Sequence, residues 1–298
     1  PKEIGERIRA SWDADELSLY GRFDFILAKD GTPKILEFNA DTPTSLLEAS
    51  VIQWQWKEDV FPECDQFNGI HEGLVQSWKD IFPKKGEIHF AGALENNEDT
   101  GTLQYLASTA MEAGFSTRVL DMQALDLQNG RFFDPAGELV NRCFKLYPWE
   151  WMVDESPDGC LAEMEWLEPI WKLVMSNKAI LATLYELFPD SPYVLPCYLS
   201  RPRSGLFCKK PVFSREGHNV SVVDIRDWEE YVRIAETEGD YNTGAYVYQE
   251  YVEPTAYSGR YPVIGSWIIG GEAAGIGIRE NRMEVTDNLS EFVPHIIG

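Results

Sequence analysis

The hydrophobic and polar positions of the first forty residues predict a helix followed by a β-hairpin. The earliest apolar residues recur at helical intervals with polar residues between them, which predicts a helix over residues 3–20 that ends before Gly21. Two apolar runs follow at residues 23–27 and 35–38, and the turn sequence Asp-Gly-Thr-Pro at residues 30–33 separates them. Two short apolar runs around such a turn are typical of a β-hairpin.

The polar residues of this hairpin are spaced so that they share a face. Successive side chains of a strand point to opposite sides of the sheet. Arg22 and Asp24 therefore share one side of the first strand, and Glu37 and Asn39 share one side of the second. We expect these four side chains to meet on one face of the hairpin.

The rest of the chain combines helical and strand patterns. Helices are predicted over residues 44–60 and 71–81 from their apolar spacing. A strand, helix and strand pattern over residues 87–122 is typical of a parallel βαβ unit, so residues 61–145 are expected to form a compact α/β subdomain. Helices predicted around residues 161–187 lead into strands broken by Gly and Pro, which gives the C-terminal part an α+β pattern.

The amino-acid composition limits the kinds of binding partner that the protein can have. The 298 residues include 26 Lys and Arg against 49 Asp and Glu, a formal net charge of −23. Nucleic-acid affinity depends largely on Lys and Arg, so a general nucleic-acid binder is excluded. No apolar run reaches the roughly 18 residues that a membrane-spanning helix needs. With 44% hydrophobic residues the chain is expected to fold as a globular protein without a membrane partner.

The cysteines and histidines point to no covalent or metal-hydrolase chemistry. The five cysteines are scattered without a CxxC pair, and the four histidines form no HExxH spacing, so neither a disulfide framework nor a zinc site is predicted. No GxSxG nucleophile motif occurs. A reducing, cytoplasmic setting fits this pattern best. The chain begins at Pro1 and enters a helical pattern at once, so we expect a further segment before it in the full-length protein.

The hairpin face is the first candidate site. Asp24, Glu37 and Asn39 offer the hard oxygen ligands that Mg²⁺ prefers, and Arg22 beside them would suit a phosphate. Alternatively, these are solvent-facing residues of an ordinary amphipathic hairpin. The strand pattern alone does not choose between the two interpretations.

Four further positions could bind a nucleotide. Lys210 lies in an apolar strand, and the turn at residues 214–219 that follows contains a Gly that would let it fold over phosphates. Neither the Walker A pattern nor GxGxxG occurs, so a plain hairpin remains an alternative. Lys178 enters a helix after a polar turn, and Gln249 lies in an alternating strand that could present an edge to a planar base. Arg279 ends a Gly-rich strand and would be a second phosphate cation.

Six segments in order resemble the C-terminal synthetase region of the glutathionylspermidine synthase family, and the likeness runs over nearly the whole chain. It is close to single-domain, synthetase-like bacterial acid–amine ligases of that family. The segments are GRFDF, ILEFNADTPTSLLEA, SNKAIL, KKPVFSREGHNVSV, YVYQEYV and GSWIIGGEAAGIGIRE. The resemblance implies an α+β, ATP-grasp fold with an inserted small, pre-ATP-grasp-like α/β subdomain. Its parts would be the metal-binding hairpin with helices (1–60), the α/β substrate side (61–150) and the nucleotide-binding portion with its lid (151–298).

The resemblance also implies roles for the hairpin residues. Asp24, Glu37 and Asn39 match the magnesium ligands of the family. Arg22 matches the arginine that contacts the reacting phosphate and acyl group, and Arg279 matches a late arginine near the γ-phosphate. These two arginines are therefore the expected catalytic residues, and Mg²⁺ is an expected cofactor.

The remaining matches concern ATP, the other expected cofactor. Lys178 and Lys210 match the two lysines that hold its phosphates, Gly217 belongs to the phosphate-covering loop, and Gln249 falls at the adenine hinge. The implied enzyme is a C–N bond-forming acid–amine ligase (EC 6.3.1-like) that forms an amide through an acyl phosphate. An alternative is a catalytically silent, ATP-binding regulatory protein on the same scaffold.

The implied substrates are a small-molecule carboxylate, a peptide such as glutathione, and a polyamine-like amine. Glu98 and Asp99 fall where family members recognise the amino end of glutathione. Residues 41–45 read Asp-Thr-Pro-Thr-Ser where glutathione-using members are closer to D-S-A-S-C, and the segment at residues 147–151 lacks a threonine of the family. The resemblance therefore predicts the nucleotide chemistry of this chain more directly than the identity of its substrates. It leaves the oligomeric state open.

Overall fold

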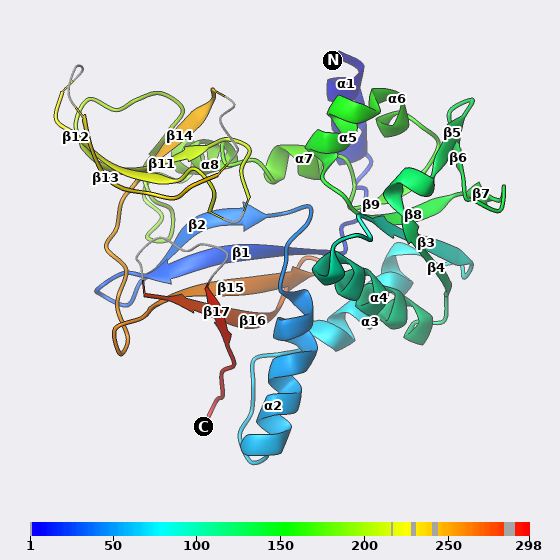
Figure 1. The fold of residues 1–298 in the computed structure, drawn as a ribbon, viewed down its shortest axis with the longest axis horizontal. Coiled ribbons are helices and arrows are strands. Elements are labelled where there is room, and N and C mark those ends of the chain that lie inside the picture. Colours follow the sequence, from blue (N-terminus) through cyan, green and yellow to red (C-terminus); the bar gives the residue numbers. More distant parts are fainter. Residues whose placement is uncertain (1, 216, 228–230, 240–243, 283–289) are drawn as a thin grey trace.

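The computed structural model describes residues 2–215, 217–227, 231–239, 244–282 and 290–298 as a mixed α/β fold with several sheets (Figure 1). Most of the described strands belong to two five-stranded antiparallel sheets and a four-stranded parallel sheet. The others form a three-stranded ribbon that extends from the parallel sheet. None of the helices described in these ranges is both long and apolar enough to cross a membrane.

The central sheet has the order β17-β16-β15-β1-β2 and contains the predicted hairpin. Its strands are β1 (Tyr20–Leu27), β2 (Pro33–Asn39), β15 (Tyr261–Ile269), β16 (Glu272–Asn281) and β17 (Glu291–Val293). The hairpin prediction is confirmed, because β1 and β2 pair antiparallel across the expected turn. The sheet therefore joins the N-terminal and C-terminal parts of the chain.

The predicted first helix is wrong in its second half. Helix α1 (Lys2–Asp13) stops well before residue 20, and Asp15 then adopts a left-handed backbone with φ 51°. The backbone N–H groups of Leu19 and Tyr20 donate to the buried carboxylate of Glu168. This tertiary contact, which helical spacing does not show, draws the segment into strand β1.

The parallel sheet has the order β4-β3-β8-β9 and confirms the βαβ prediction. Its strands are β3 (Glu87–Gly92), β4 (Ser116–Asp121), β8 (Arg142–Leu146) and β9 (Glu165–Leu167), with the crossover helix α4 (Asn97–Glu112). The ribbon consists of β5 (Asp126–Gln128), β6 (Arg131–Phe133) and β7 (Leu139–Val140). Strand β9 corrects the helix expected around residues 161–187, because these residues pair with β8 before the helices begin.

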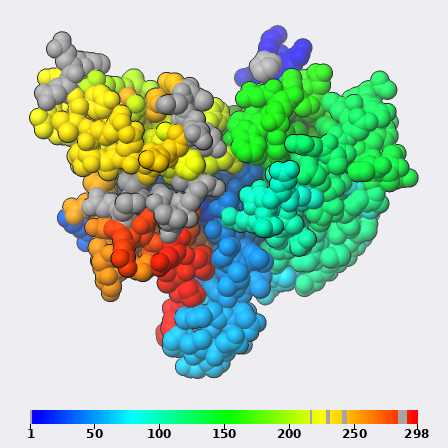
Figure 2. All heavy atoms as spheres, in the orientation of Figure 1, coloured from blue at the N-terminus to red at the C-terminus, as the bar shows by residue number. Residues whose placement is uncertain are grey.

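The second antiparallel sheet, with the order β10-β14-β11-β12-β13, confirms the strands expected in residues 197–250. Its strands are β10 (Cys197–Tyr198), β11 (Gly205–Pro211), β12 (Ser221–Ile225), β13 (Tyr231–Glu236) and β14 (Tyr246–Glu250). In the space-filling view its residues form the yellow lobe, opposite the green lobe of the parallel sheet (Figure 2).

Helices connect the sheets, and those expected at residues 44–60 and 71–81 are present. The first begins with a π-helical turn at its N-terminal end. The helices are η1 (Glu48–Ile52), α2 (Gln53–Val60), α3 (Ile70–Ile81), η2 (Met122–Ala124), α5 (Trp149–Glu155), α6 (Pro157–Cys160), α7 (Lys172–Met175) and α8 (Ile180–Leu187).

One hydrophobic core is shared by the central and parallel sheets. Tyr20 of β1 stacks on Trp267 of β15 and meets Phe144 of β8 edge to face. Trp78 of α3 packs against the same Phe144, and all four side chains are almost completely buried. This packing holds the hairpin against the end of the parallel sheet.

Candidate functional site

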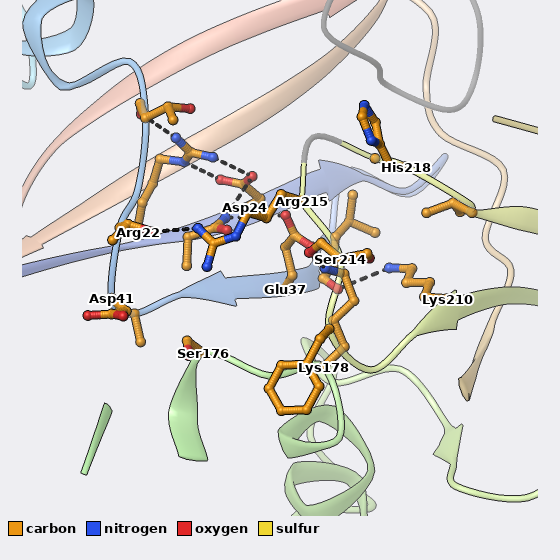
Figure 3. Close-up of a pocket in the computed structure, with 18 of the residues that line it drawn as sticks. Arg22, Asp24, Glu37, Asp41, Ser176, Lys178, Lys210, Ser214, Arg215 and His218 are labelled. Carbon is orange, nitrogen blue, oxygen red and sulfur yellow. Dashed lines mark hydrogen bonds and ion pairs between the residues drawn. The ribbon is translucent and has the colours of Figure 1, made fainter. Parts of the chain in front are cut away.

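A single pocket brings together all the residues that the sequence singled out. It has a volume of about 330 Å³, and its walls come from the hairpin, the second antiparallel sheet and the segments after β3 and β8. The nine predicted residues that line it are Arg22, Asp24, Glu37, Asn39, Lys178, Lys210, Gly217, Gln249 and Arg279. Figure 3 shows the arginine, lysine and carboxylate side chains converging on this pocket.

The four polar residues of the hairpin meet on one face, as expected. Arg22 lies directly opposite Asn39 across the strand pair, and Asp24 lies opposite Glu37. The Asn39 side-chain N–H donates to Asp24 at 3.3 Å and to Glu37 at 3.2 Å. Only 5% of Arg22 and 3% of Asp24 is exposed. The alternative of an ordinary solvent-facing hairpin is therefore wrong.

Two arginines donate to the Asp24 carboxylate, and Figure 3 shows the nearer one, Arg22, beside it. Arg22 donates to it through Nε at 2.6 Å and Nη2 at 2.9 Å, and Arg279 donates from β16 at 3.1 Å. Burial lowers the pKa of Arg22, but Asp24, Glu37 and Glu98 together outweigh burial, so this pKa is raised. The pKa of Arg279 is lowered by burial and by the nearby Arg22. The pocket therefore holds more positive charge than Asp24 neutralises.

Two lysines approach the hairpin from the other side. Lys178 precedes α8, and its Nζ lies 3.1 Å from Glu37 Oε2 while donating to the carbonyl of Ser214 at 2.7 Å. Lys210 on β11 donates to the Leu36 carbonyl at 3.1 Å. Burial would raise the pKa of Glu37, but Lys178 and Lys210 outweigh it and lower that pKa to about 2. Glu37 is therefore a stable carboxylate.

Gln249 lines the pocket, and both polar atoms of its side chain have partners within the protein. It is 2% exposed, its Oε1 accepts from Lys210 at 2.7 Å, and its Nε2 donates to the Ile35 carbonyl at 2.9 Å. The side chain thus fixes Lys210 against the hairpin. Residues 250–252, at and just beyond the end of β14, line the same pocket.

The loop between β11 and β12 crosses the pocket to the opposite wall. Arg215 donates through Nη1 to Thr42 Oγ1 at 2.6 Å and through Nη2 to Glu150 of α5, and its guanidinium lies 5.4 Å from the Trp151 ring. Gly217 lines the pocket with φ 70°. Glu216, within the predicted turn, lies outside the described residues. The sequence offered one signal for Arg215, an arginine in a Gly-containing loop after Lys210.

A buried ion pair that the sequence analysis missed fixes the loop after Asn39. Lys145 Nζ lies 2.7 Å from Asp41 Oδ1, and the other oxygen of Asp41 accepts from the backbone N–H of Trp149. Both side chains are almost completely buried. Burial lowers the pKa of Lys145, and Asp41 partly offsets this shift. The pair joins the hairpin to the ends of β8 and α5.

The oxygen donors suit a divalent cation that arrives with phosphate. Within the described part of the chain, no three His, Cys, Asp or Glu side chains cluster around a possible metal position. The hairpin supplies two carboxylates and one amide, and Mg²⁺ is commonly held by one or two carboxylates together with substrate phosphates. The residues present therefore fit Mg²⁺ in company with a nucleotide.

The whole sequence matches a known family model. Residues 1–298 match the one described as "Glutathionylspermidine synthase preATP-grasp". The chain belongs to this family. The resemblance predicted from the sequence motifs is thereby confirmed, and membership in the glutathionylspermidine synthase preATP-grasp family supports an amide-forming ligase.

Three relatives illustrate the range of the family. The chain is 39% identical to a Haemophilus influenzae protein named "Putative acid–amine ligase", over 97% of this chain and 77% of that protein. It is 28% identical to trypanothione synthetase of Crithidia fasciculata, over 98% of this chain and 49% of the relative. It is 26% identical to the bifunctional glutathionylspermidine synthetase/amidase of Escherichia coli, over 100% of this chain and 52% of that protein. The chain thus spans about half the length of the last two.

Two solved structures share the fold at 10% sequence identity. One is described as a "Putative gamma-glutamylcysteine synthetase" from Methylobacillus flagellatus, with a TM-score of 0.60 over 99% of this chain and 84% of that chain. The other is a glutathione synthetase-like effector from Globodera pallida in its apo form, with a TM-score of 0.58 over 99% of this chain and 86% of that chain. At this identity the likeness describes the fold alone.

Proposed function

We propose that the chain is an ATP- and Mg²⁺-dependent carboxylate–amine ligase that forms an amide through an acyl phosphate. The observation that carries this proposal is the pairing, in one pocket, of a carboxylate and amide face on the hairpin with two lysines and two arginines. Phosphoryl transfer requires a pre-positioned set of this kind, because catalysis depends mainly on placing and neutralising the phosphates.

Each side chain has a separate part in this proposal. Asp24, Glu37 and Asn39 would hold Mg²⁺, which when bound neutralises negative charge on the phosphates. Lys178 and Lys210, fixed by Ser214 O and Gln249, would hold the phosphate oxygens. These lysines come from the loop before α8 and from β11, so the nucleotide would lie between the hairpin and the second antiparallel sheet.

The two arginines would act where the acyl phosphate forms. A substrate carboxylate oxygen attacks the γ-phosphorus, the bond to the bridging oxygen breaks, and ADP leaves with that electron pair. Arg22 and Arg279 would stabilise the charge on the transferred group. An amine then attacks the acyl carbon, and inorganic phosphate leaves as the amide forms.

The Arg215 loop would protect this intermediate from water. It already contacts Thr42 and Glu150 on the far wall, and Gly217 provides the left-handed residue that lets the backbone turn over the pocket. Shielding a reactive intermediate is a common reason for a loop that closes over an active site. We therefore assign this loop as the lid.

We further propose an ATP-grasp arrangement with three parts: residues 1–60 with the metal-binding hairpin, residues 61–150 on the substrate side, and residues 151–298 with the nucleotide. The two walls of the pocket support this division. The nucleotide wall carries Lys178 and Lys210, and the opposite wall carries the ends of β3 and β8 with the start of α4.

The substrates proposed are a small peptide-like carboxylate, such as glutathione, and a polyamine-like amine. The names of two relatives support this choice. Glu98 and Asp99 line the same pocket at the start of α4, and carboxylates raise the local concentration of cations. Trp151 occupies the segment that lacks the family threonine and lines the pocket as well, so the carboxylate subsite has its own shape in this chain.

The test is Mg²⁺-dependent phosphate release from ATP, with glutathione and spermidine together and with each omitted in turn. We expect release to need both substrates and Asp24→Ala to abolish it while the fold is kept. Asp30→Ala, in the exposed turn of the same hairpin, is the matched control and should keep the wild-type rate. Wild-type turnover by Asp24→Ala would contradict the metal assignment. ATP binding without release by any acid and amine would favour the silent regulatory protein.

A further inference from the structure

Both oxygens of the Asp24 carboxylate are engaged by nitrogen donors. Oδ1 accepts from Arg22 Nε, and Oδ2 accepts from Arg22 Nη2, from Asn39 and from Arg279. A cation bound at Oδ2 would have to replace at least one of these donors, and a cation bound at Oδ1 would lie beside the Arg22 guanidinium. The same group that suits a metal is therefore occupied by the protein's own cations.

Glu37, the second carboxylate, is engaged in the same way. Its Oε1 accepts from Asn39, and its Oε2 pairs with Lys178. The Asn39 side chain directs its N–H group, and not its oxygen, at both acids. The immediate cluster thus has two carboxylates and four cations, Arg22, Arg279, Lys178 and Lys210. Farther along the wall, Asp41 is paired with Lys145 and Glu150 with Arg215, and Glu98, Asp99 and Glu250 also line the pocket, so the excess of cations is confined to the hairpin cluster.

The two arginines on Asp24 differ in how firmly they are held. Arg22 donates its third nitrogen to the Thr44 carbonyl, lies 5.7 Å from the Trp267 ring, and has a side chain that is 6% exposed. The Arg279 side chain is 25% exposed and reaches Asp24 through one nitrogen, Nη2. Arg279 is therefore the donor that can leave Asp24 without disturbing the buried pair.

We propose that this pocket accepts a divalent cation only together with a polyphosphate, and that Arg279 controls this order. A polyphosphate gives Arg279 and the lysines an anionic partner, so that they release oxygens of Asp24 and Glu37 to the metal. A divalent cation alone meets two carboxylates that Arg22, Arg279 and Lys178 already hold. This inference rests on the proposed nucleotide site and adds a binding order and a residue that sets it.

The experiment measures metal and nucleotide binding separately, without turnover. Free Mn²⁺ is followed by electron paramagnetic resonance as protein is added without nucleotide, and ATP binding is measured by calorimetry in EDTA and in Mg²⁺. We expect the wild-type protein to leave the Mn²⁺ signal unchanged and to bind ATP in EDTA. Arg279→Met should bind Mn²⁺ without nucleotide, at least about tenfold more tightly than the wild type, because one competing positive charge is gone.

Two further variants make the result specific. Arg279→Lys keeps the positive charge and should leave the Mn²⁺ signal unchanged without nucleotide, as the wild type does. Arg131→Met removes an exposed arginine of the same kind, paired with Glu163 in the ribbon, and should have no effect. Thermal melting and circular dichroism of each variant verify that the fold is kept.

The possible outcomes separate this inference from the proposed function. Mn²⁺ binding by the wild-type protein without nucleotide, or an Arg279→Met variant that resembles the wild type, would overturn the inference while nucleotide binding stands. If ATP bound in Mg²⁺ but not in EDTA, the nucleotide would need the metal in order to bind. That result would overturn the proposed order, in which the phosphate first draws Arg279 away from Asp24. Absence of ATP binding under both conditions would overturn the proposed function and this inference together.

Discussion

At the scale of single residues, the arrangement of the site depends on a glycine that carries no chemistry. Gly265 of β15 lies opposite Asp24 in the strand register. A Cβ atom at this position would lie 2.7 Å from Arg22 Cδ and 3.2 Å from its Nε. The missing side chain thus provides the space in which the Arg22 guanidinium reaches Asp24.

Gly265→Ala should therefore damage the site more than the fold. The new methyl group pushes Arg22 away from Asp24, and overpacking of this kind costs about 1–3 kcal/mol of unfolding free energy. We expect phosphate release to fall at least about tenfold, since the two groups no longer share their bidentate geometry. Gly5→Ala, in α1, is the matched control, because a Cβ there meets nothing within 4 Å. Wild-type turnover by Gly265→Ala would contradict a role for Arg22 placement.

Residue types and local spacing made the nine pocket residues candidates, and the family resemblance gave them roles, but neither pointed to their partners. Strand alternation placed Asp24 and Glu37 on one face because that rule acts within a few residues. The burial of Asp24 beneath Arg279, which is 255 positions away, depends on β15 and β16 joining the hairpin sheet. Such a contact is set by topology, and no local pattern contains it.

At the scale of elements, the segments that line the pocket are fixed by buried charges at their ends. Lys145 ends β8, and its ammonium lies against Asp41 of the hairpin loop, the Tyr147 carbonyl and the Trp149 ring. Lys172 of α7 donates to the carbonyls of Tyr20 and Ala40. Each lysine thereby ties the parallel-sheet side of the molecule to the hairpin.

Lys145→Met should destabilise the whole protein strongly. It leaves the Asp41 carboxylate buried without its cation, and breaking a buried pair in this way costs about 3–5 kcal/mol. Lys2→Met is the control, since it removes an exposed pair with Glu6 and should leave the unfolding free energy unchanged. Chemical denaturation by urea measures both variants. A Lys145→Met protein as stable as the wild type would show that Asp41 does not depend on its partner.

The same elements show which features of the fold a local sequence pattern can predict and which it cannot. The hairpin and the βαβ unit were predicted because their signals are local, a turn sequence and a change of hydrophobic period. The predicted end of α1 was wrong because Glu168, which is 148 positions from Tyr20, accepts from the backbone N–H groups of Leu19 and Tyr20 where β1 begins. Strand β9 was missed because three residues give too short a pattern to separate from the helices that follow.

At the scale of the whole molecule, a cluster of cations lies at the hairpin of a strongly acidic protein. The net charge is −23, yet four of the 26 basic residues meet at the hairpin. Exposed carboxylates repel polyanions, whereas the cation cluster at the hairpin would attract a nucleotide. The same excess of negative charge acts against the folded state, because folding brings the carboxylates closer together.

Added salt should therefore stabilise the protein. Raising NaCl from about 10 mM to about 150 mM shortens the Debye length from about 30 Å to about 8 Å, which screens repulsion between exposed carboxylates. Buried pairs such as Lys145 and Asp41 are screened much less. We expect the Tm in differential scanning calorimetry to rise by about 2–4 °C, and KCl at equal ionic strength to give the same shift. A fall in Tm would mean that exposed ion pairs, which salt weakens, contribute more than the net charge.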